Sequence, residues 1–216
     1  MFRTAAVITA LIVAMAGPAV ARQASPASEG ARAEAQRLID KSGGGALFED
    51  ASAGDVPGVR HVRSGLRCTF EPGSPTNAVN LNPTSIARGD DVSCSTAAGS
   101  AIHTVYATKF GQAISAEDNI RMAAMAIEMR FPNTKPYTGG VTAQSEGAPV
   151  PILTRRFESD GPDGARLYQR VSVAMVGPWT VKLRTTSPLD DAPGADLMAE
   201  ATMIQAVKDV AEAGGR

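Results

Sequence analysis

Aromatic residues, cysteines and histidines are scarce in this 216-residue sequence, and neither sign of charge is in excess. Phe, Trp and Tyr make up 5% of the chain, too few for the stacking platforms that bind bases or sugars. The 21 Lys and Arg residues are balanced by 22 Asp and Glu residues. Because a protein without a basic excess is poorly suited to neutralising phosphates, we expect no nucleic-acid partner.

The signatures of several enzyme and cofactor classes are also missing. Three glycines at 43–45 lack the lysine and the following helix of a phosphate-binding loop. The sequence has no Gly-x-Ser-x-Gly elbow and no His-Glu-x-x-His pair. Asp90 and Asp91 lack the oxygen-ligand spacing of an EF-hand, so we assign them to a solvated turn. We therefore predict no cofactor and no metal site.

The first 21 residues follow the pattern of a secretory signal peptide. Arg3 precedes an apolar run over 5–16, a Gly-Pro pair interrupts the run, and small residues lead up to Ala21. The run is too short to span a bilayer, which takes about 20 apolar residues. Abundant alanine, with arginine favoured over lysine, is typical of a high-GC bacterium. We expect cleavage after Ala21, export to the periplasm and no transmembrane anchor after signal cleavage.

The two cysteines, Cys68 and Cys94, allow one disulfide in an oxidising compartment. Each shares the phase of the apolar residue two positions before it, so each faces the buried side of a short predicted strand. We therefore predict a disulfide, with the two strands adjacent and the side chains facing each other beneath a helix. The alternatives are free buried thiols, a thiol nucleophile assisted by a histidine, and a metal site.

Capping patterns predict two helices in the first two thirds of the chain. Ser28 caps a short helix with a thin apolar stripe, which we expect to dock loosely at the edge of the domain. Ser115 caps a second helix, which Pro132 stops. A methionine stripe in this second helix (Met122, Met125 and Met129) widens its apolar face. Such a stripe can mark a binding surface, but core packing is commoner, and we assign it to the core.

Strands are predicted where apolar residues alternate or β-branched residues cluster. They lie near 59–72 (with a break at Ser64-Gly65), 78–81, 91–95, 102–110, 152–159, 166–176 and 179–186. Gly177-Pro178 joins the last two strands as an antiparallel hairpin. A final helix spans about 195–211, and its predicted apolar face consists of Leu197, Ala201, Ile204, Val207 and either Val210 or Ala211.

These elements predict an α+β fold: an antiparallel β-sheet flanked by helices, one inserted mid-chain and one C-terminal, with a single disulfide. Because the strands have one polar face, we expect full coverage on only one side of the sheet. We divide the chain into a signal peptide at 1–21, a flexible N-terminal segment with a short helix at 22–57, and a single α+β domain at 58–213.

The order of elements over 59–211 resembles the fold shared by PsbP and Mog1. The stretch "GPWTVKLRTTSP", a hairpin strand followed by the last helix, is the best local match. The resemblance implies a small binding or assembly factor. No diagnostic motif is matched, so it assigns no functional residue.

Two sets of residues are candidates for a functional site. Arg170, Lys182 and Arg184 lie on polar phases of neighbouring predicted strands, so they form a candidate patch for an anionic ligand. A solvated face, or pairing with acidic residues, is the alternative. His61 and His103 are the only histidines, and any histidine-dependent hydrolase chemistry would need one of them in a cleft with a nucleophile and an acid.

Two function classes follow. The first is an exported, periplasmic, non-enzymatic domain that binds an envelope protein or a small ligand. The second is a periplasmic hydrolase-type enzyme using His61 or His103. The sequence favours the first and leaves the oligomeric state open.

Overall fold

The computed structural model describes residues 25–82, 87–139, 145 and 147–215. The predicted signal peptide, 1–21, therefore lies outside the described residues. Within them, no helix is both long enough and apolar enough to cross a membrane.

Three helices and ten strands make up the described fold, with short 3₁₀ turns at Gly45–Leu47 and Leu189–Asp191. The helices are α1 (Glu29–Ser42), α2 (Ala116–Arg130) and α3 (Ala192–Gly214). The strands are β1 (Phe48–Asp50), β2 (Gly58–His61), β3 (Arg67–Thr69), β4 (Ala78–Leu81), β5 (Asp91–Ala98), β6 (Ala101–Thr108), β7 (Lys135–Pro136), β8 (Leu153–Asp160), β9 (Arg166–Val176) and β10 (Trp179–Pro188).

The strands form two antiparallel sheets rather than one. A small sheet has the order β1-β2-β3, and a large sheet has the order β4-β5-β6-β10-β9-β8-β7. The α+β class, the mid-chain helix and the C-terminal helix are confirmed. The hairpin predicted at Gly177-Pro178 is present as the β9–β10 pair, and the break predicted at Ser64-Gly65 is the turn between the paired strands β2 and β3.

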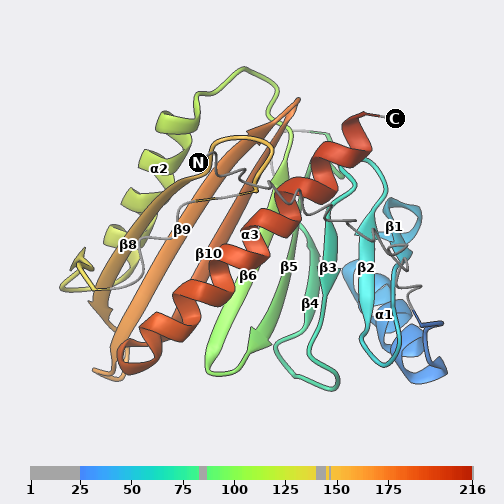
Figure 1. Cartoon of the computed structure of the whole chain (residues 1–216), viewed down its shortest axis with the longest axis horizontal. Coiled ribbons are helices and arrows are strands. Elements are labelled where there is room, and N and C mark those ends of the chain that lie inside the picture. The colour runs from blue at the N-terminus through green and yellow to red at the C-terminus, as the bar shows by residue number, and fades with distance from the viewer. Residues whose placement is uncertain (1–24, 83–86, 140–144, 146, 216) are drawn as a thin grey trace, which may run out of the picture.

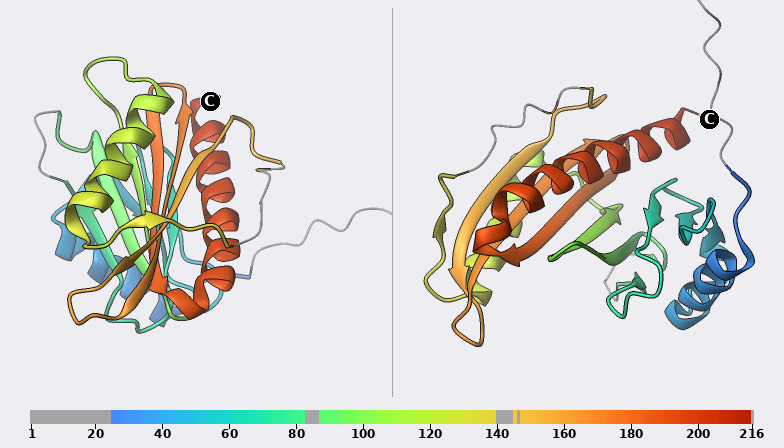
Figure 2. Two further views of the ribbon diagram at one scale, coloured as in Figure 1. Left: turned by 90° about the vertical axis from the view of Figure 1, so that its left-hand side faces the viewer. Right: turned by 60° about the horizontal axis from the view of Figure 1, so that its bottom comes forward.

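The two faces of the large sheet are covered to different extents, in line with the expectation of full coverage on only one side. α2 lies against one face at β8 and β9, while α3 crosses the other face diagonally (Figures 1 and 2). The small sheet packs beside α3 on the second face, since Val59 and Leu66 share a core with Val92 and Leu183 of the large sheet. The face that meets α3 and the small sheet is therefore buried, whereas Ile102 and Arg184 on the other face remain partly exposed.

Helix α1 is more firmly docked than its thin apolar stripe suggested. The Ser28 hydroxyl accepts a hydrogen bond from the Ala31 amide, as the cap predicted. Ala35, Leu38 and Ile39 are fully buried and belong to the main core. Loose docking was therefore wrong for this helix, because α1 packs against β4 and the small sheet. The division of the chain at residue 57 stays a prediction.

The exposed faces of α2 and α3 also differ from the prediction. In α2, Ser115 caps the helix as predicted and Ile120 and Ile127 are buried, yet Met129 is 85% exposed. Met122 and Met125 are about half exposed, so the methionine stripe faces outward. In α3, Val207 is buried as predicted but Leu197 is 61% exposed, and the buried face also carries Met203, several alanines and two acids.

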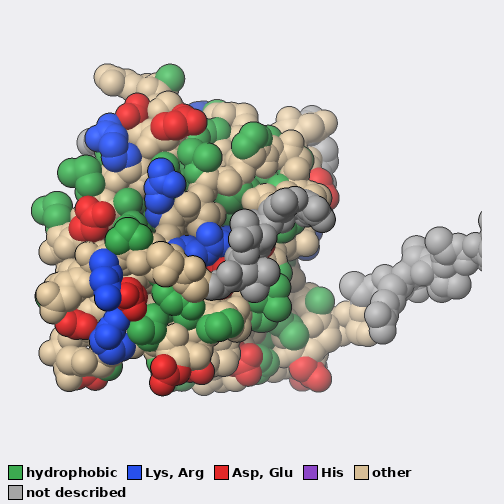
Figure 3. Space-filling model, turned by 60° about the vertical axis from the view of Figure 1, so that its left-hand side comes forward, with side chains coloured by type: hydrophobic (Ala, Val, Ile, Leu, Met, Phe, Trp, Pro, Cys, Tyr) green, Lys and Arg blue, Asp and Glu red, His purple; other side chains and the backbone are tan. Residues whose placement is uncertain are grey.

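The surface around α2 and β8 carries no single-sign charge field. Basic and acidic side chains alternate with apolar ones on this side of the molecule (Figure 3). Several of these charges form exposed pairs, such as Arg166 with Glu158 and Arg121 with Asp118. A charged site on this surface would therefore have to use charged residues that are not part of such pairs.

Candidate functional site

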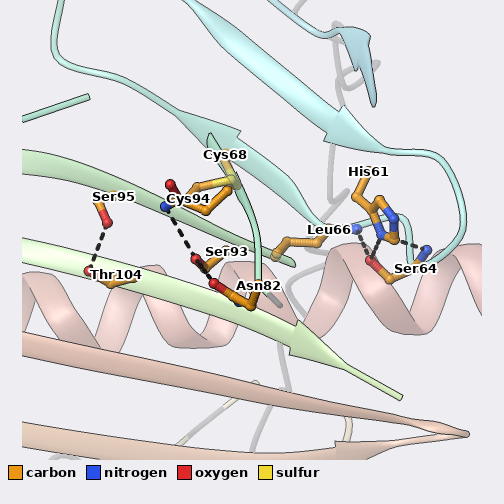
Figure 4. Close-up of a disulfide and its surroundings, with 10 residues drawn as sticks. His61, Ser64, Leu66, Cys68, Asn82, Ser93, Cys94, Ser95 and Thr104 are labelled. Atoms are coloured by element: carbon orange, nitrogen blue, oxygen red, sulfur yellow. Dashed lines mark hydrogen bonds between the residues drawn. A yellow bond between two sulfur atoms is a disulfide. The ribbon is translucent and has the colours of Figure 1, made fainter. Parts of the chain in front are cut away.

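The predicted disulfide between Cys68 and Cys94 is present, and it joins the two sheets (Figure 4). Cys68 lies on β3 of the small sheet and Cys94 on β5 of the large one. The two strands are thus not hydrogen-bonded neighbours, although their side chains face each other as expected. No free cysteine occurs among the described residues, so thiol catalysis and metal binding by these cysteines have no support.

A groove runs beside this disulfide, between α3 and β3, and strands β5 and β6 form its floor. Its volume is about 620 Å³. We call it the α3–β3 groove. Its walls are largely apolar and include the disulfide itself, Phe70, Val105, Met198, Ala201 and Ala206. Polar side chains stand mainly at the rim, where Gln205 donates a hydrogen bond of 2.8 Å to Asp209.

Among the residues that line the α3–β3 groove, His103 is a buried polar side chain with a nitrogen that is unpaired in the described part of the chain. It projects from β6 and is only 3% exposed. Its Nδ1 lies 2.8 Å from Oγ1 of Thr185, its neighbour on β10. Its Nε2 has no hydrogen-bond partner among the described residues. Buried polar atoms are nearly always paired, so this nitrogen requires an explanation.

The electrostatic surroundings keep His103 uncharged. Burial lowers the pKa of this histidine from 6.5 to about 4, and the nearby positive charge of Arg170 acts in the same direction. At neutral pH the ring is therefore neutral, with one nitrogen engaged by Thr185 and the other buried and unpaired among the described residues. A neutral imidazole can present that second nitrogen as a donor or as an acceptor.

The surroundings of His61, in contrast, give this residue a structural role. Its Nδ1 accepts a hydrogen bond of 3.3 Å from the Ser64 amide and lies 2.8 Å from the Ser64 hydroxyl, within the β2–β3 turn (Figure 4). The ring is 1% exposed and packs between Phe48 and Trp179. Burial lowers its pKa to about 4, helped by Arg63. No substrate could reach this ring without unfolding the turn.

The structure does not bring the predicted cationic patch together. Arg170 pairs with Thr185 across the strands, whereas Arg184 pairs with Val171. Directly paired residues point to the same face, so Arg170 faces α3 and Arg184 faces the α2 side. Lys182 shares the face of Arg184, with its Nζ 4.3 Å from the ring centroid of Tyr106. A single patch containing all three was therefore wrong.

Arg170 is instead the centre of a buried ionic network. It is fully buried and pairs with Asp196 at 2.6 Å and with Glu200, both on α3. Asp196 also accepts hydrogen bonds from Tyr168 and Arg156. Burial alone would raise the pKa of Asp196, but these hydrogen bonds and the Arg170 charge hold it below its ordinary value.

The sequence analysis missed Asp196 and Glu200. One signal was available: the two acids stand four residues apart among alanines, so they share a helix face with small residues. A helix face of that kind is suited to close packing over a buried cation. The prediction relied on larger apolar residues such as Leu197, and it therefore placed the buried face on another side of the helix.

Neither histidine has the surroundings of a catalytic base. Each lies next to a hydroxyl group, but in the described part of the chain neither is hydrogen-bonded to a carboxylate that could orient it. No group of three or more His, Cys, Asp or Glu side chains that could hold a metal ion occurs within the described ranges.

Comparison with known proteins gives similarity at the level of fold alone. No family model and no curated protein matches the chain. One similar solved structure is a protein of unknown function, PA94, from Pseudomonas aeruginosa, with 12% identity and a TM-score of 0.37 over 64% of this chain and 88% of that one. Another is LpqN of Mycobacterium tuberculosis, described as involved in cell envelope biogenesis, with 13% identity and a TM-score of 0.34 over 62% of this chain and 84% of that one. At these values neither assigns a function or a site residue.

Proposed function

We propose that this protein is an exported, non-enzymatic domain that binds a small amphipathic ligand in the α3–β3 groove. One observation carries the proposal: a buried, uncharged His103 lines an otherwise largely apolar groove, and its Nε2 is unpaired among the described residues. A ligand that supplies a partner for this nitrogen removes the cost of leaving it unsatisfied.

The form of the groove favours a small molecule over a folded protein partner. Pockets for small ligands measure about 300–1,000 Å³ and have mostly apolar walls with a few placed polar groups. The volume of about 620 Å³ and the walls of Phe70, Val105 and Met198 fit that description. The ligand should have an apolar body and one hydrogen-bonding group.

The hydrogen-bonding group of the ligand should be uncharged. His103 stays neutral because burial and Arg170 oppose its protonation. It therefore offers a carboxylate no opposite charge, whereas a carbonyl, hydroxyl or amine group can pair with the neutral ring. A fatty alcohol, an amide or an ester would meet this requirement.

Export is supported by two features. The signal-peptide pattern ends at Ala21, and the disulfide is of the kind that persists in oxidising compartments. N-terminal sequencing of the protein released from the periplasm by osmotic shock should begin at Arg22. A full-length protein recovered from the cytoplasm would contradict export.

Ligand binding can be tested with N-phenyl-1-naphthylamine, an uncharged apolar dye with a single N–H group. We expect a saturable rise in its fluorescence when it is titrated with the mature protein. Ala201→Trp places a large side chain in the groove from an exposed position of α3, so it should abolish the rise. Ala126→Trp, the same change at an exposed position of α2, should leave the rise intact.

The role of His103 is tested separately from the shape of the groove. His103→Leu removes the unpaired nitrogen, so dye affinity should fall by about tenfold, the value of roughly one hydrogen bond. Circular dichroism should first show that the His103→Leu and Ala201→Trp variants are folded. Equal dye binding by the wild type and Ala201→Trp would overturn the proposed site.

A further inference from the structure

A second hollow lies on the opposite face of the large sheet, beyond the C-terminal end of α2. Its volume is about 380 Å³. We call it the β6–β10 hollow. Strands β6, β9 and β10 and the end of α2 line it with polar side chains, among them Thr104, Tyr106, Gln169, Arg130, Arg184 and Thr186. Its composition contrasts with that of the apolar α3–β3 groove.

Gln169 lines this hollow and carries a buried donor group. The side chain is only 3% exposed, and its Oε1 accepts a hydrogen bond of 2.7 Å from the Thr186 hydroxyl. The Nε2 group has no hydrogen-bond partner among the described residues. Because an amide nitrogen can only donate, the missing partner must be an acceptor.

Two arginines at the same hollow have no acidic partner. Within the described ranges, neither Arg130 nor Arg184 has a carboxylate within 4.0 Å, and neither donates a side-chain hydrogen bond. An arginine without a carboxylate partner at an exposed position, such as Arg155, is solvated by water. Arg184 is also half-buried, which makes its charge less well solvated than that of a surface arginine.

Other charges on this face reinforce the positive potential. Lys182 lies beside Arg184 on β10, and burial and the charge of Arg184 lower its pKa. Asp91 is the acid that acts on Lys182, but Thr108 and Asn82 already donate hydrogen bonds to its carboxylate. The hollow therefore combines unpaired cations with an unpaired neutral donor, and the groups that line it include no acid.

We propose that the β6–β10 hollow binds a small oxyanion, a carboxylate or a phosphoryl group. Arg184 and Arg130 supply the charge and the forked donor geometry that such groups prefer. The Gln169 amide supplies a fixed donor at the base. Ile102, which is 45% exposed, and Phe131 flank the site and would contact the organic part of the ligand.

The experiment is an NMR titration of ¹⁵N-labelled mature protein with sodium phosphate and, in parallel, with sodium acetate. Ionic strength is held constant with sodium chloride, so that general screening does not mimic binding. We expect a saturable shift of the Gln169 side-chain amide resonances and of the backbone amides near Thr186. The anion that saturates at the lower concentration assigns the ligand as a phosphoryl compound or a carboxylate.

A pair of matched variants identifies the site. Arg184→Gln should weaken binding by about tenfold or more, because it removes a charge-assisted contact. Arg155→Gln makes the same change of charge at an exposed position of β8, outside the hollow, and should leave the affinity unchanged. Ala201→Trp should also have no effect, which separates this site from the α3–β3 groove.

Two results would overturn the inference. The first is a Gln169 amide that does not move, or moves linearly without saturation, with both anions. The second is equal weakening by Arg184→Gln and Arg155→Gln, which would mean that the anions respond only to the net charge of the protein.

Discussion

The most constrained side chain is Arg170, a fully buried cation beneath α3. Its guanidinium meets Asp196, Glu200 and the hydroxyl of Ser172, so three groups satisfy it. A buried charge without partners would be very costly, and the alanine-rich face of α3 allows the helix to approach closely enough to supply them. The network thereby orients α3 on the sheet, and α3 in turn forms one wall of the α3–β3 groove.

Arg170→Met tests this network. It leaves the Glu200 carboxylate without its cation and Asp196 with Arg156 alone, so the free energy of unfolding should fall by about 3–5 kcal/mol. Urea denaturation at neutral pH measures the change. Arg166→Met breaks the half-exposed pair with Glu158 and should cost at most about 1 kcal/mol. Equal losses for the two variants would show that burial of the network adds nothing.

Among the elements, the β9–β10 and β2–β3 turns depend on glycine for different reasons. Gly177, between β9 and β10, has a φ of +55° and open space where a Cβ would stand. Gly65, between β2 and β3, has a φ of +77°, and a Cβ there would overlap the Cβ of Ala213 and lie 3.0 Å from the carbonyl oxygen of Asp209. The β2–β3 turn therefore lies tightly against α3.

Replacement of each glycine by alanine separates backbone strain from packing. Gly177→Ala should cost about 1–2 kcal/mol, the strain of a left-handed residue. Gly65→Ala should cost a further 1–3 kcal/mol, roughly the penalty of overpacking. Thermal and urea denaturation measure both. Ala213→Gly in the Gly65→Ala background should recover part of the loss, and failure to do so would contradict the contact.

For the whole molecule, the two buried histidines make stability depend on pH. Each has a pKa of about 4 in the folded protein against 6.5 for an ordinary histidine. The unfolded chain therefore binds protons more readily between these values. The contribution of the two neutral histidines to the free energy of unfolding is fully present above pH 6.5 and is lost as the pH falls towards 4.

The expected loss is on the order of 3 kcal/mol for each histidine at the acid end of this window. Urea denaturation at a series of pH values from 7.5 to 4.5 measures it. His103→Gln should remove about half of the slope, and His61→Gln the other half. A wild-type stability that is flat from pH 7 to pH 5 would show that the two rings titrate in the folded protein as they do in the unfolded chain.

Local features of the fold were readable from the chain. The caps at Ser28 and Ser115 and the turn at Gly177-Pro178 follow from interactions within a few residues, so they need no knowledge of the rest of the molecule. The disulfide was readable for a similar reason: two cysteines on inward phases allow only one pairing.

Pairing between strands decides which side of the sheet each face of a strand points to. Alternation divides β9 and β10 into two faces each, but it does not say which face of one strand joins which face of the next. The register of Arg170 with Thr185 sends Arg170 under α3, and that of Arg184 with Val171 sends Arg184 to the other side. Both candidate sites depend on this choice. They also combine residues far apart in the chain, such as Phe70 with Met198, because packing between distant segments, rather than local geometry, creates a cavity.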